Sequence, residues 1–386
     1  MLTTDRSEQL DGIIDASISD FDIPAAVYER AVARYGHVGD WLSGYWTGPA
    51  GGGDVYPQGS FRLGTVVQPI DPRDDYDIDL VCRRDISKES TTQELLKTDV
   101  GNALGRYVAT GPDGKPGLRE GKRCWTLEYP AEPFHMDVLP AVPDREAAPN
   151  GILVTDRELR RWQHSNPIDY ASWFQLRMAR ELLERRAAAA QARKMDVEDV
   201  PEWQVKTTLQ RTVQALKRHR DSYFAEKAED RPASIIITTL AARAYTGSGS
   251  LYDVLVDVTA AMPTLIERRD GVWWVENPVQ PEENFADRWR AHPGRDRLFF
   301  EWIARAHTDF AGFGSERGVD RVLMKIAGAF GERPAKSAGA AYGTALADAR
   351  DRGRLGMAGG TGLLSAAATK PIPRHTFHGD APSGRA

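Results

Sequence analysis

The chain of 386 residues lacks the features that mark secreted and membrane proteins. It has only two cysteines, Cys82 and Cys124, which argues against a disulfide framework or a zinc site. Both are expected to be small buried residues in a reducing compartment. No apolar run approaches the ~20 residues of a membrane span, and the first residues carry no basic segment leading into an apolar core. These absences predict a cytoplasmic protein with no membrane partner.

An excess of basic residues is also missing. The formal net charge is -5, whereas a dedicated binder of long nucleic acid usually carries a basic domain. Long nucleic acid is therefore an unlikely partner, although nucleotides are not excluded, because metal ions and a few local cations can neutralise their phosphates. The composition, 41% hydrophobic and 27% charged, is that of an ordinary globular protein.

The stretch from Asp74 to Cys82 is the most informative part of the sequence. Side chains alternate along a strand, so Asp77 and Asp79 share one face while Ile78 and Leu80 share the other. Two carboxylates on one face repel each other unless they are protonated, hydrogen-bonded or neutralised by a cation. Mg²⁺ prefers such oxygen ligands. The alternative interpretation is a solvated acidic loop that runs into a strand.

Two further segments favour the metal site. Upstream, the run from Gln58 to Thr65 contains a Gly-Ser pair and a second glycine, which together allow backbone N–H groups to approach phosphate oxygens. Downstream, the alternating run from Phe134 to Leu139 places Asp137 on the face opposite its apolar neighbours. That position suits a third carboxylate on a neighbouring strand.

A Gly-Ser pair, then Asp-x-Asp, then a lone Asp on a later strand resembles the DNA polymerase β-like nucleotidyltransferase superfamily. The fuller string, Gly59 to Thr65 with Asp77, Asp79 and Asp137, resembles the bacterial CD-NTases, which are relatives of cyclic GMP-AMP synthase and oligoadenylate synthase. The resemblance covers about residues 40–330. It implies an α+β fold, with a mixed-sheet nucleotidyltransferase lobe, an α-helical lobe like that of oligoadenylate synthase, and an active site in the cleft between them.

The sequence pattern divides the chain into four parts. Residues 1–45 are predicted to form N-terminal helices that brace the two lobes, and residues 46–165 the nucleotidyltransferase core. Residues 166–332 are predicted to form a helical domain, and residues 333–386, rich in alanine and glycine, a flexible tail. Within the core we expect a helix at 91–109 and strands at 54–57, 76–83, 122–129, 134–140 and 152–154.

The resemblance also assigns roles to residues of the core. Asp77, Asp79 and Asp137 would be the catalytic residues and would bind two Mg²⁺ ions, for which Mn²⁺ may substitute. Asp137 is the best candidate to help deprotonate the attacking hydroxyl. Ser60 would hydrogen-bond the triphosphate, and Gln58 and Gly59 would shape the wall beside it.

The predicted helix at 203–221 carries a polar stripe beside its apolar one. Lys206, Gln210, Gln214 and Lys217 lie along this stripe, which in most helices is a solvated face. By resemblance, Lys217 matches a lysine that contacts the triphosphate, whereas Lys206 has no such support.

Two further segments resemble parts of the family's cleft. Ser234 matches a polar nucleotide contact, with a simple helix N-cap as the equal alternative. Some relatives have an aromatic residue directly after this serine, stacked on a base, but this chain has Ile235. The loop at 276–285 is expected to be structural and to close the helical domain over the cleft.

The resemblance implies an enzyme that joins ATP or other nucleoside triphosphates into a cyclic di- or trinucleotide and releases pyrophosphate, as a signal in bacterial antiphage defence (CBASS). A template-independent transferase acting on RNA or on a small molecule is an alternative, as is a catalytically dead nucleotide-binding module. Partners from the same operon are expected, either an activator or a ubiquitin-transfer-like enzyme that acts on the C-terminal tail. The segment from Lys370 to Gly379 is the part of the tail that such a partner would grip.

Overall fold

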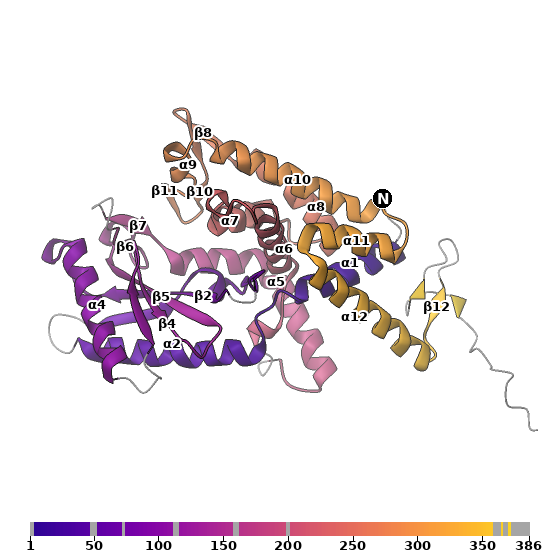
Figure 1. The fold of residues 1–386 in the computed structure, drawn as a ribbon, viewed down its shortest axis with the longest axis horizontal. Coiled ribbons are helices and arrows are strands. Elements are labelled where there is room, and N and C mark those ends of the chain that lie inside the picture. Colours follow the sequence, from indigo (N-terminus) through magenta and orange to yellow (C-terminus); the bar gives the residue numbers. More distant parts are fainter. Residues whose placement is uncertain are drawn as a thin grey trace, which may run out of the picture.

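The computed structural model describes residues 4–46, 52–71, 74–110, 116–156, 162–197, 201–357, 364–365 and 370–371. The chain forms two lobes that lie side by side (Figure 1). We call them the sheet lobe and the helical lobe. None of the helices in these ranges has the length and apolar character needed to cross a bilayer.

The sheet lobe is built on one mixed sheet. In the described part of the chain its strands are β1 (Gly53–Pro57), β2 (Tyr76–Arg84), β3 (Gly117–Glu120), β4 (Trp125–Glu128), β5 (Phe134–Pro143), β6 (Ile152–Val154) and β7 (Gln163–Ser165). The order is β1-β2-β5-β4-β3, and β6 and β7 continue from β5. β2 and β5 are parallel, and the other neighbours are antiparallel. The strands predicted at 122–129 and 134–140 are confirmed as the antiparallel pair β4 and β5, whereas β3 and β7 were not predicted.

The two faces of this sheet have different partners. On one face, Ile78 and Leu80 of β2 are buried in a single apolar core with the helices α2 (Ala25–Tyr45) and α4 (Gln93–Thr110). The other face carries the alternate residues of the same strand, Asp77 and Asp79. The two-residue period of the strand therefore separates the core from the polar face, as the sequence predicted.

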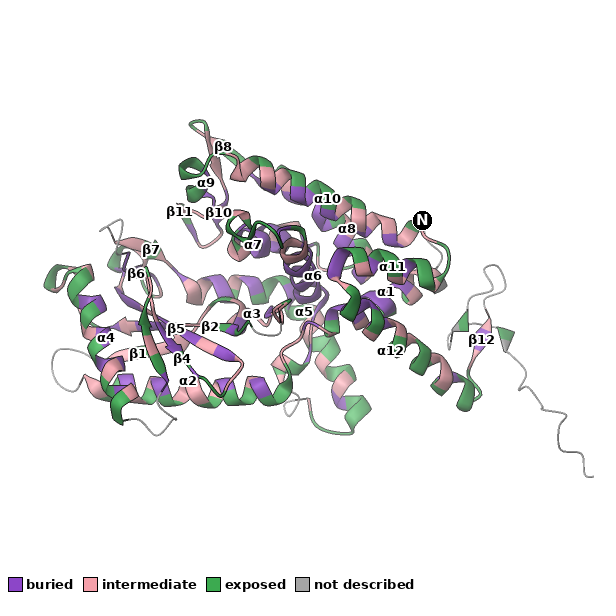
Figure 2. Ribbon diagram, viewed as in Figure 1, coloured by how far each residue is buried: buried purple, intermediate pink, exposed green. Residues whose placement is uncertain are grey.

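The helical lobe contains the N-terminal helix as well as the second half of the chain. Its helices are α1 (Thr4–Ser19), α5 (Pro167–Arg193), α6 (Thr208–Tyr223), α7 (Ser234–Ala244), α8 (Leu251–Ala261), α9 (Asp287–Ala291), α10 (Arg295–Ser315), α11 (Val319–Phe330) and α12 (Glu332–Asp351). Figure 2 shows that α6 lies in the interior, and Thr208 to His219 are all buried.

The expectation of an almost wholly helical second half was wrong in one region. Two hairpins occur there, β8 (Glu267–Arg269) with β9 (Val272–Trp274) and β10 (Glu276–Asn277) with β11 (Gln280–Asn284). α8 ends before Pro263, which lacks the N–H that a helix interior needs. Asp270 and Gly271 both have positive φ, as a two-residue hairpin turn requires.

The polar stripe of α6 joins the two lobes. Its side chains donate to backbone carbonyls of the segment 63–68, which follows the short helix α3 (Gly59–Leu63) of the sheet lobe. The donor–acceptor pairs are Gln210 to Leu63 (3.0 Å), Lys206 to Gly64 (2.9 Å), Lys217 to Thr65 (3.1 Å), Gln214 to Val66 (2.8 Å) and Arg218 to Gln68 (2.6 Å). The solvated face considered from the sequence is thus a buried contact between lobes.

The expected flexible tail from residue 333 was wrong for its first part. α12 continues to Asp351 and packs along α1, where Arg333 and Ser337 both bond Asp20. The small strands β12 (Gly356–Met357), β13 (Leu364–Ser365) and β14 (Lys370–Pro371) follow. Most of the segment expected to grip a partner, 372–379, lies outside the described residues.

The interlobe stripe yields a stability prediction. Gln214→Leu keeps the volume but leaves the Val66 carbonyl and one Asp22 carboxylate oxygen without the amide that bonds both at 2.8 Å. We expect a loss of about 1–3 kcal/mol in the free energy of unfolding, measured by denaturant titration. The control is Gln191→Leu on the exposed side of α5, which we expect to change stability by less than about 0.5 kcal/mol. Equal effects of the two variants would contradict a role for the stripe.

Candidate functional site

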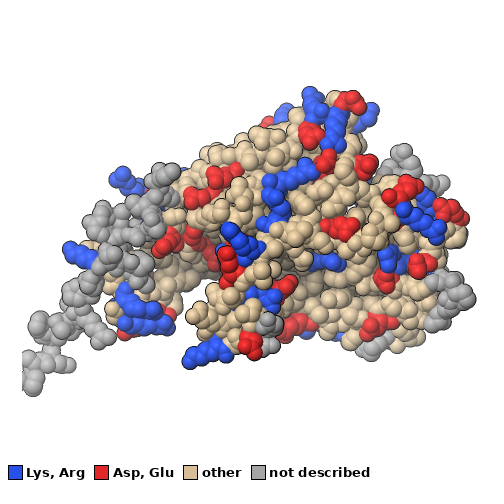
Figure 3. All heavy atoms as spheres, turned by 180° about the vertical axis from the view of Figure 1, so that it is seen from behind, with Lys and Arg blue, Asp and Glu red and all other residues tan. Residues whose placement is uncertain are grey.

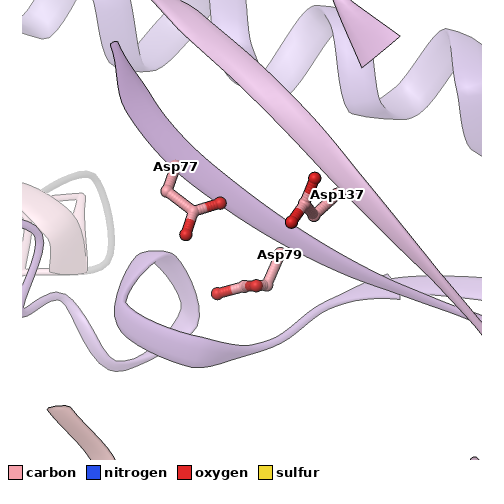
Figure 4. A group of neighbouring side chains, drawn as sticks. All are labelled: Asp77, Asp79 and Asp137. Carbon is pink, nitrogen blue, oxygen red and sulfur yellow. The ribbon is translucent and has the colours of Figure 1, made fainter. Parts of the chain in front are cut away.

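Three carboxylates meet on the open face of the sheet. Asp77 and Asp79 project from β2 and Asp137 from β5, and each offers an oxygen within 4.8 Å of the others (Figure 4). The register explains the meeting, because Asp79 pairs with Asp137 across the parallel β2–β5 ladder. The structure therefore brings together the three residues that the sequence singled out.

The environment of the cluster disfavours negative charge. Burial, and then the negative charges of Asp77 and Asp137, raise the pKa of Asp79 to about 8. Burial and the charge of Asp137 also raise the pKa of Asp77, which His135 Nε2 approaches at 3.5 Å. Without a cation, the site therefore favours a proton on Asp79 at neutral pH.

Asp137 differs from its neighbours in having side-chain donors on both oxygens. The Thr126 hydroxyl donates to Oδ1 at 2.6 Å, and the Cys124 thiol donates to Oδ2 at 3.2 Å. Burial and the nearby Asp137 raise the pKa of Cys124 to about 12, so the thiol keeps its proton. Cys124 is half-buried and lies just before β4, whereas Cys82 is fully buried in the core, and both are free thiols.

The Gly-Ser turn lies directly against the cluster. The Gln58 N–H donates to the Asp79 carbonyl at 2.8 Å, and α3 begins at Gly59. Gly59 has φ +60, and a Cβ there would approach an Asp79 carboxylate oxygen to 2.3 Å, so this position requires glycine. The Ser60 hydroxyl makes no hydrogen bond with a described residue, which leaves it available to a ligand.

A cavity of about 660 Å³ opens beside Asp79, between the two lobes. The Gly-Ser turn and the β7 strand line one side, and the start of α7 and the β11 strand line the other. Nineteen of its lining residues had not been expected to bind anything, among them Arg123, His164, Tyr170, Ile235, Glu283 and Phe285. The volume is in the range of small-molecule sites.

Lys217 lies near the carboxylates but is not exposed to the cavity. Its ammonium group donates to the carbonyl and hydroxyl of Thr65 at 3.1 and 3.3 Å. Burial lowers the pKa of Lys217 to about 7, although the negative charges of Asp79 and Asp77 act in the opposite direction. Lys206, at the other end of the stripe, donates to the Gly64 carbonyl of the same segment at 2.9 Å.

Ser234 is the first residue of α7, and the N-cap position belongs to Ala233, so the N-cap interpretation was wrong. Its hydroxyl accepts a hydrogen bond from Arg220 at 2.8 Å. Ala233 and Ile235 line the cavity, whereas Ser234 itself does not. A role for Ser234 in nucleotide binding remains a prediction.

The far wall of the cavity was missed by the sequence analysis. Arg123 donates to the buried Asp156 at 2.9 Å, and Glu283 accepts from the Asn277 amide at 2.7 Å. Burial raises the pKa of Glu283 to about 7. The only signal for this wall was the loop 276–285, which was expected to close over the cleft and which does line it.

The donor set fits a hard divalent cation. All three side chains offer carboxylate oxygens, the ligands that Mg²⁺ takes in proteins. Their mutual repulsion, seen in the raised pKa of Asp79, is what a bound cation would offset. Asp77, Asp79 and Asp137 are therefore the residues that would hold such an ion.

Comparisons with known proteins agree with this geometry. Residues 54–140 match the family model of the cyclic GMP-AMP synthase DncV-like nucleotidyltransferase domain. The c-di-GMP synthase of Roseivirga ehrenbergii is 27% identical over 388 residues, covering 98% of this chain and 100% of the relative. The cyclic dinucleotide synthase CdnG of Bradyrhizobium diazoefficiens is 27% identical over 307 residues, covering 73% of this chain and 71% of the relative.

Solved structures share the fold. CdnG of Bradyrhizobium diazoefficiens in complex with GTP superposes with a TM-score of 0.67 at 21% identity, covering 86% of this chain and 99% of that one. GTP-bound DncV of Vibrio cholerae gives a TM-score of 0.55 at 17% identity, covering 86% and 87%. Over residues 54–140 the chain thus carries a DncV-like nucleotidyltransferase domain, and over nearly its full length it is similar to a c-di-GMP synthase.

Proposed function

We propose that the protein joins nucleoside triphosphates, GTP among them, into a cyclic dinucleotide and releases pyrophosphate. The observation that carries the proposal is the cluster of three carboxylates at the edge of an interlobe cavity large enough for nucleotides. The choice of GTP rests on relatives described as a c-di-GMP synthase and as CdnG in complex with GTP. The same resemblance supports a role for the product as a signal in antiphage defence.

The chain's own residues suit the parts of this reaction. Asp77, Asp79 and Asp137 would hold Mg²⁺, which when bound neutralises phosphate charge and lowers the pKa of the attacking hydroxyl. Asp137 is the candidate to receive the proton of that hydroxyl. Gly59, without a Cβ, lets the backbone of the turn approach a phosphate, and the Ser60 hydroxyl has no described protein partner to compete with it.

The surface supports small nucleotides over a long nucleic acid as the substrate. On the face shown in Figure 3, Lys and Arg side chains alternate with Asp and Glu, and no broad basic surface develops there. A binder of duplex or single strands relies on a positively charged face to neutralise many phosphates. The net charge of -5 agrees with this distribution.

The deciding experiment is a product assay. The full chain is incubated with Mg²⁺ and each of the four nucleoside triphosphates, singly and in pairs, and phosphatase-resistant products are identified by mass spectrometry. We expect a cyclic dinucleotide that contains guanosine, since a cyclic product has no terminal phosphate to remove. Linear products alone, or extension of an added RNA, would identify a tailing transferase instead.

The carboxylate cluster gives the first prediction. Asp77→Asn or Asp79→Asn removes a ligand charge at nearly constant volume, so we expect turnover to fall well over tenfold, or about 1.4 kcal/mol in the barrier, with the fold intact by circular dichroism. Asp75→Asn, an exposed loop position two residues away, is the matched control. Turnover within tenfold of the wild-type rate in either cluster variant would exclude the metal assignment.

The second prediction separates Lys217 of α6 from Lys206, which lies just before that helix. Lys217→Ala should weaken nucleoside triphosphate binding more than Lys206→Ala, because the Lys217 charge lies close enough to Asp77 and Asp79 to affect and be affected by them. Affinities are measured by calorimetry with a nonhydrolysable GTP analogue. Equal losses, or a larger loss for Lys206→Ala, would show that the wrong lysine was assigned to the triphosphate.

The third prediction concerns pH. Because a metal ion must displace the proton that Asp79 holds below its pKa of about 8, Mg²⁺ affinity of the nucleotide-free protein should rise by up to about tenfold per pH unit from pH 6 to 8 and then level off. Asp77→Asn removes a repelling charge, so its affinity should level off at lower pH. Calorimetric titrations at several pH values test this, and an affinity independent of pH would contradict the shifted pKa.

A further inference from the structure

Thr126 and Cys124 approach the cluster from the strand on its far side. β4 pairs antiparallel with β5, and Thr126 is directly opposite Asp137 in that register. Cys124 lies two residues earlier, so both side chains fall on the same face of the sheet. One donates to Oδ1 and the other to Oδ2, at 2.6 and 3.2 Å. The sequence analysis assigned neither residue to the site.

This arrangement distinguishes Asp137 from the other two carboxylates. Among the described residues, no side chain donates a hydrogen bond to the carboxylate of Asp79, and the His135 imidazole lies 3.5 Å from the carboxylate of Asp77. A carboxylate that accepts a hydrogen bond on each oxygen is restrained in its plane by the two donors. Thr126 of β4 and Cys124, directly before β4, therefore orient Asp137 in the absence of a ligand.

The geometry also leaves room for a metal ion. An ionised carboxylate has about four lone-pair sites, two on each oxygen. Thr126 and Cys124 each use one site, which leaves one site on each oxygen, and an oxygen of Asp137 lies within 4.8 Å of an oxygen of Asp79. Hydrogen bonds of this kind orient metal ligands in proteins, and losing one commonly costs 10–100-fold in metal affinity or activity.

We propose that Thr126 and Cys124 are positioning residues that hold the Asp137 carboxylate in the orientation for binding a divalent metal ion together with Asp79. The inference rests on the proposed function, because it takes Asp137 as a metal ligand. Thr126 is the main contributor, since its hydroxyl is a stronger donor than a thiol and its side chain is only 2% exposed.

A structural explanation has to be separated from this one. A buried hydroxyl needs a hydrogen-bond partner, and Asp137 could serve Thr126 merely as the nearest acceptor. In that case the loss of the hydroxyl would change stability and leave metal affinity unchanged. The two explanations therefore differ in the metal dissociation constant that they predict for a variant without the hydroxyl, whereas both allow a lower melting temperature.

The test measures Mn²⁺ binding to the nucleotide-free full chain by the loss of the free Mn²⁺ signal in electron paramagnetic resonance. Thr126→Val should raise the Mn²⁺ dissociation constant about 10–100-fold, and Thr126→Ser should restore it to within about threefold of wild type because the donor returns. Cys124→Ala should weaken binding less than Thr126→Val. Thr259→Val, another buried threonine whose hydroxyl bonds backbone in α8, is the matched control and should leave the constant unchanged.

Asp79→Asn identifies the part of the signal that belongs to the cluster. The proposal is overturned if Thr126→Val binds Mn²⁺ as tightly as the wild type. It is also overturned if Asp79→Asn leaves the Mn²⁺ binding of the protein unchanged, since the ion is then not bound at the cluster. If Thr126→Val does not fold, Cys124→Ala against Cys124→Ser makes the same comparison. If the wild type binds Mn²⁺ as expected and Thr126→Val binds it more weakly, but no cyclic product forms, the proposed function fails while the positioning role stands. If the wild type forms a cyclic product and Thr126→Val binds Mn²⁺ with wild-type affinity, only the positioning role fails.

Discussion

The row of hydrogen bonds from α6 to the segment 63–68 is the constraint on which the rest of the structure depends. Five side chains, spread over little more than three helical turns, replace water as donors to the backbone carbonyls at the end of α3 and in the segment that follows it. Gln210 serves twice, since it also forms a capping box with Thr207 that begins α6. Gly64 permits the approach, because a Cβ there would meet the Gln210 amide at 2.5 Å. Gln210 therefore links the start of α6 to the end of α3.

The Gly-Ser turn lies directly before this contact in the chain and borders both the carboxylate cluster and the cavity. The Gln58–Asp79 backbone bond holds the turn against Asp79, while α6 binds the segment that follows the turn. The raised pKa of Asp79 is the electrostatic cost of burying this carboxylate beside Asp77 and Asp137. Sites that bind cations often carry such a cost in the free protein, since preorganised ligands repel each other until the ion arrives.

The alternation of side chains along the sequence was enough to predict the shared face of the carboxylates. It could not predict features that depend on contacts between distant segments. The alternation around Asp77 and Asp79 is a property of any strand, so the shared face could be predicted without a structure. The donors to Asp137 could not, because the pairing of Thr126 with Asp137 depends on the register of β4. α12 was missed for another reason: its many alanines suggested a tail without a core, yet alanine is the best helix former, and Ala335 and Ala338 are buried.

The antiparallel pairing of α1 with α12 has a consequence for synthesis on the ribosome. Gln9 bonds Tyr342, and Arg333 bonds Asp20, across sequence separations of 333 and 313 residues. At about 5–20 residues per second, the apolar face of α1 emerges roughly 15–65 s before its partner helix. The sheet lobe, whose strands lie close together in sequence, can form in that interval, but the helical lobe is completed last. A nascent chain therefore contains the carboxylate strands and all the residues that line the cavity before α12 is made, so the covering of α1 by α12 is a late step of folding.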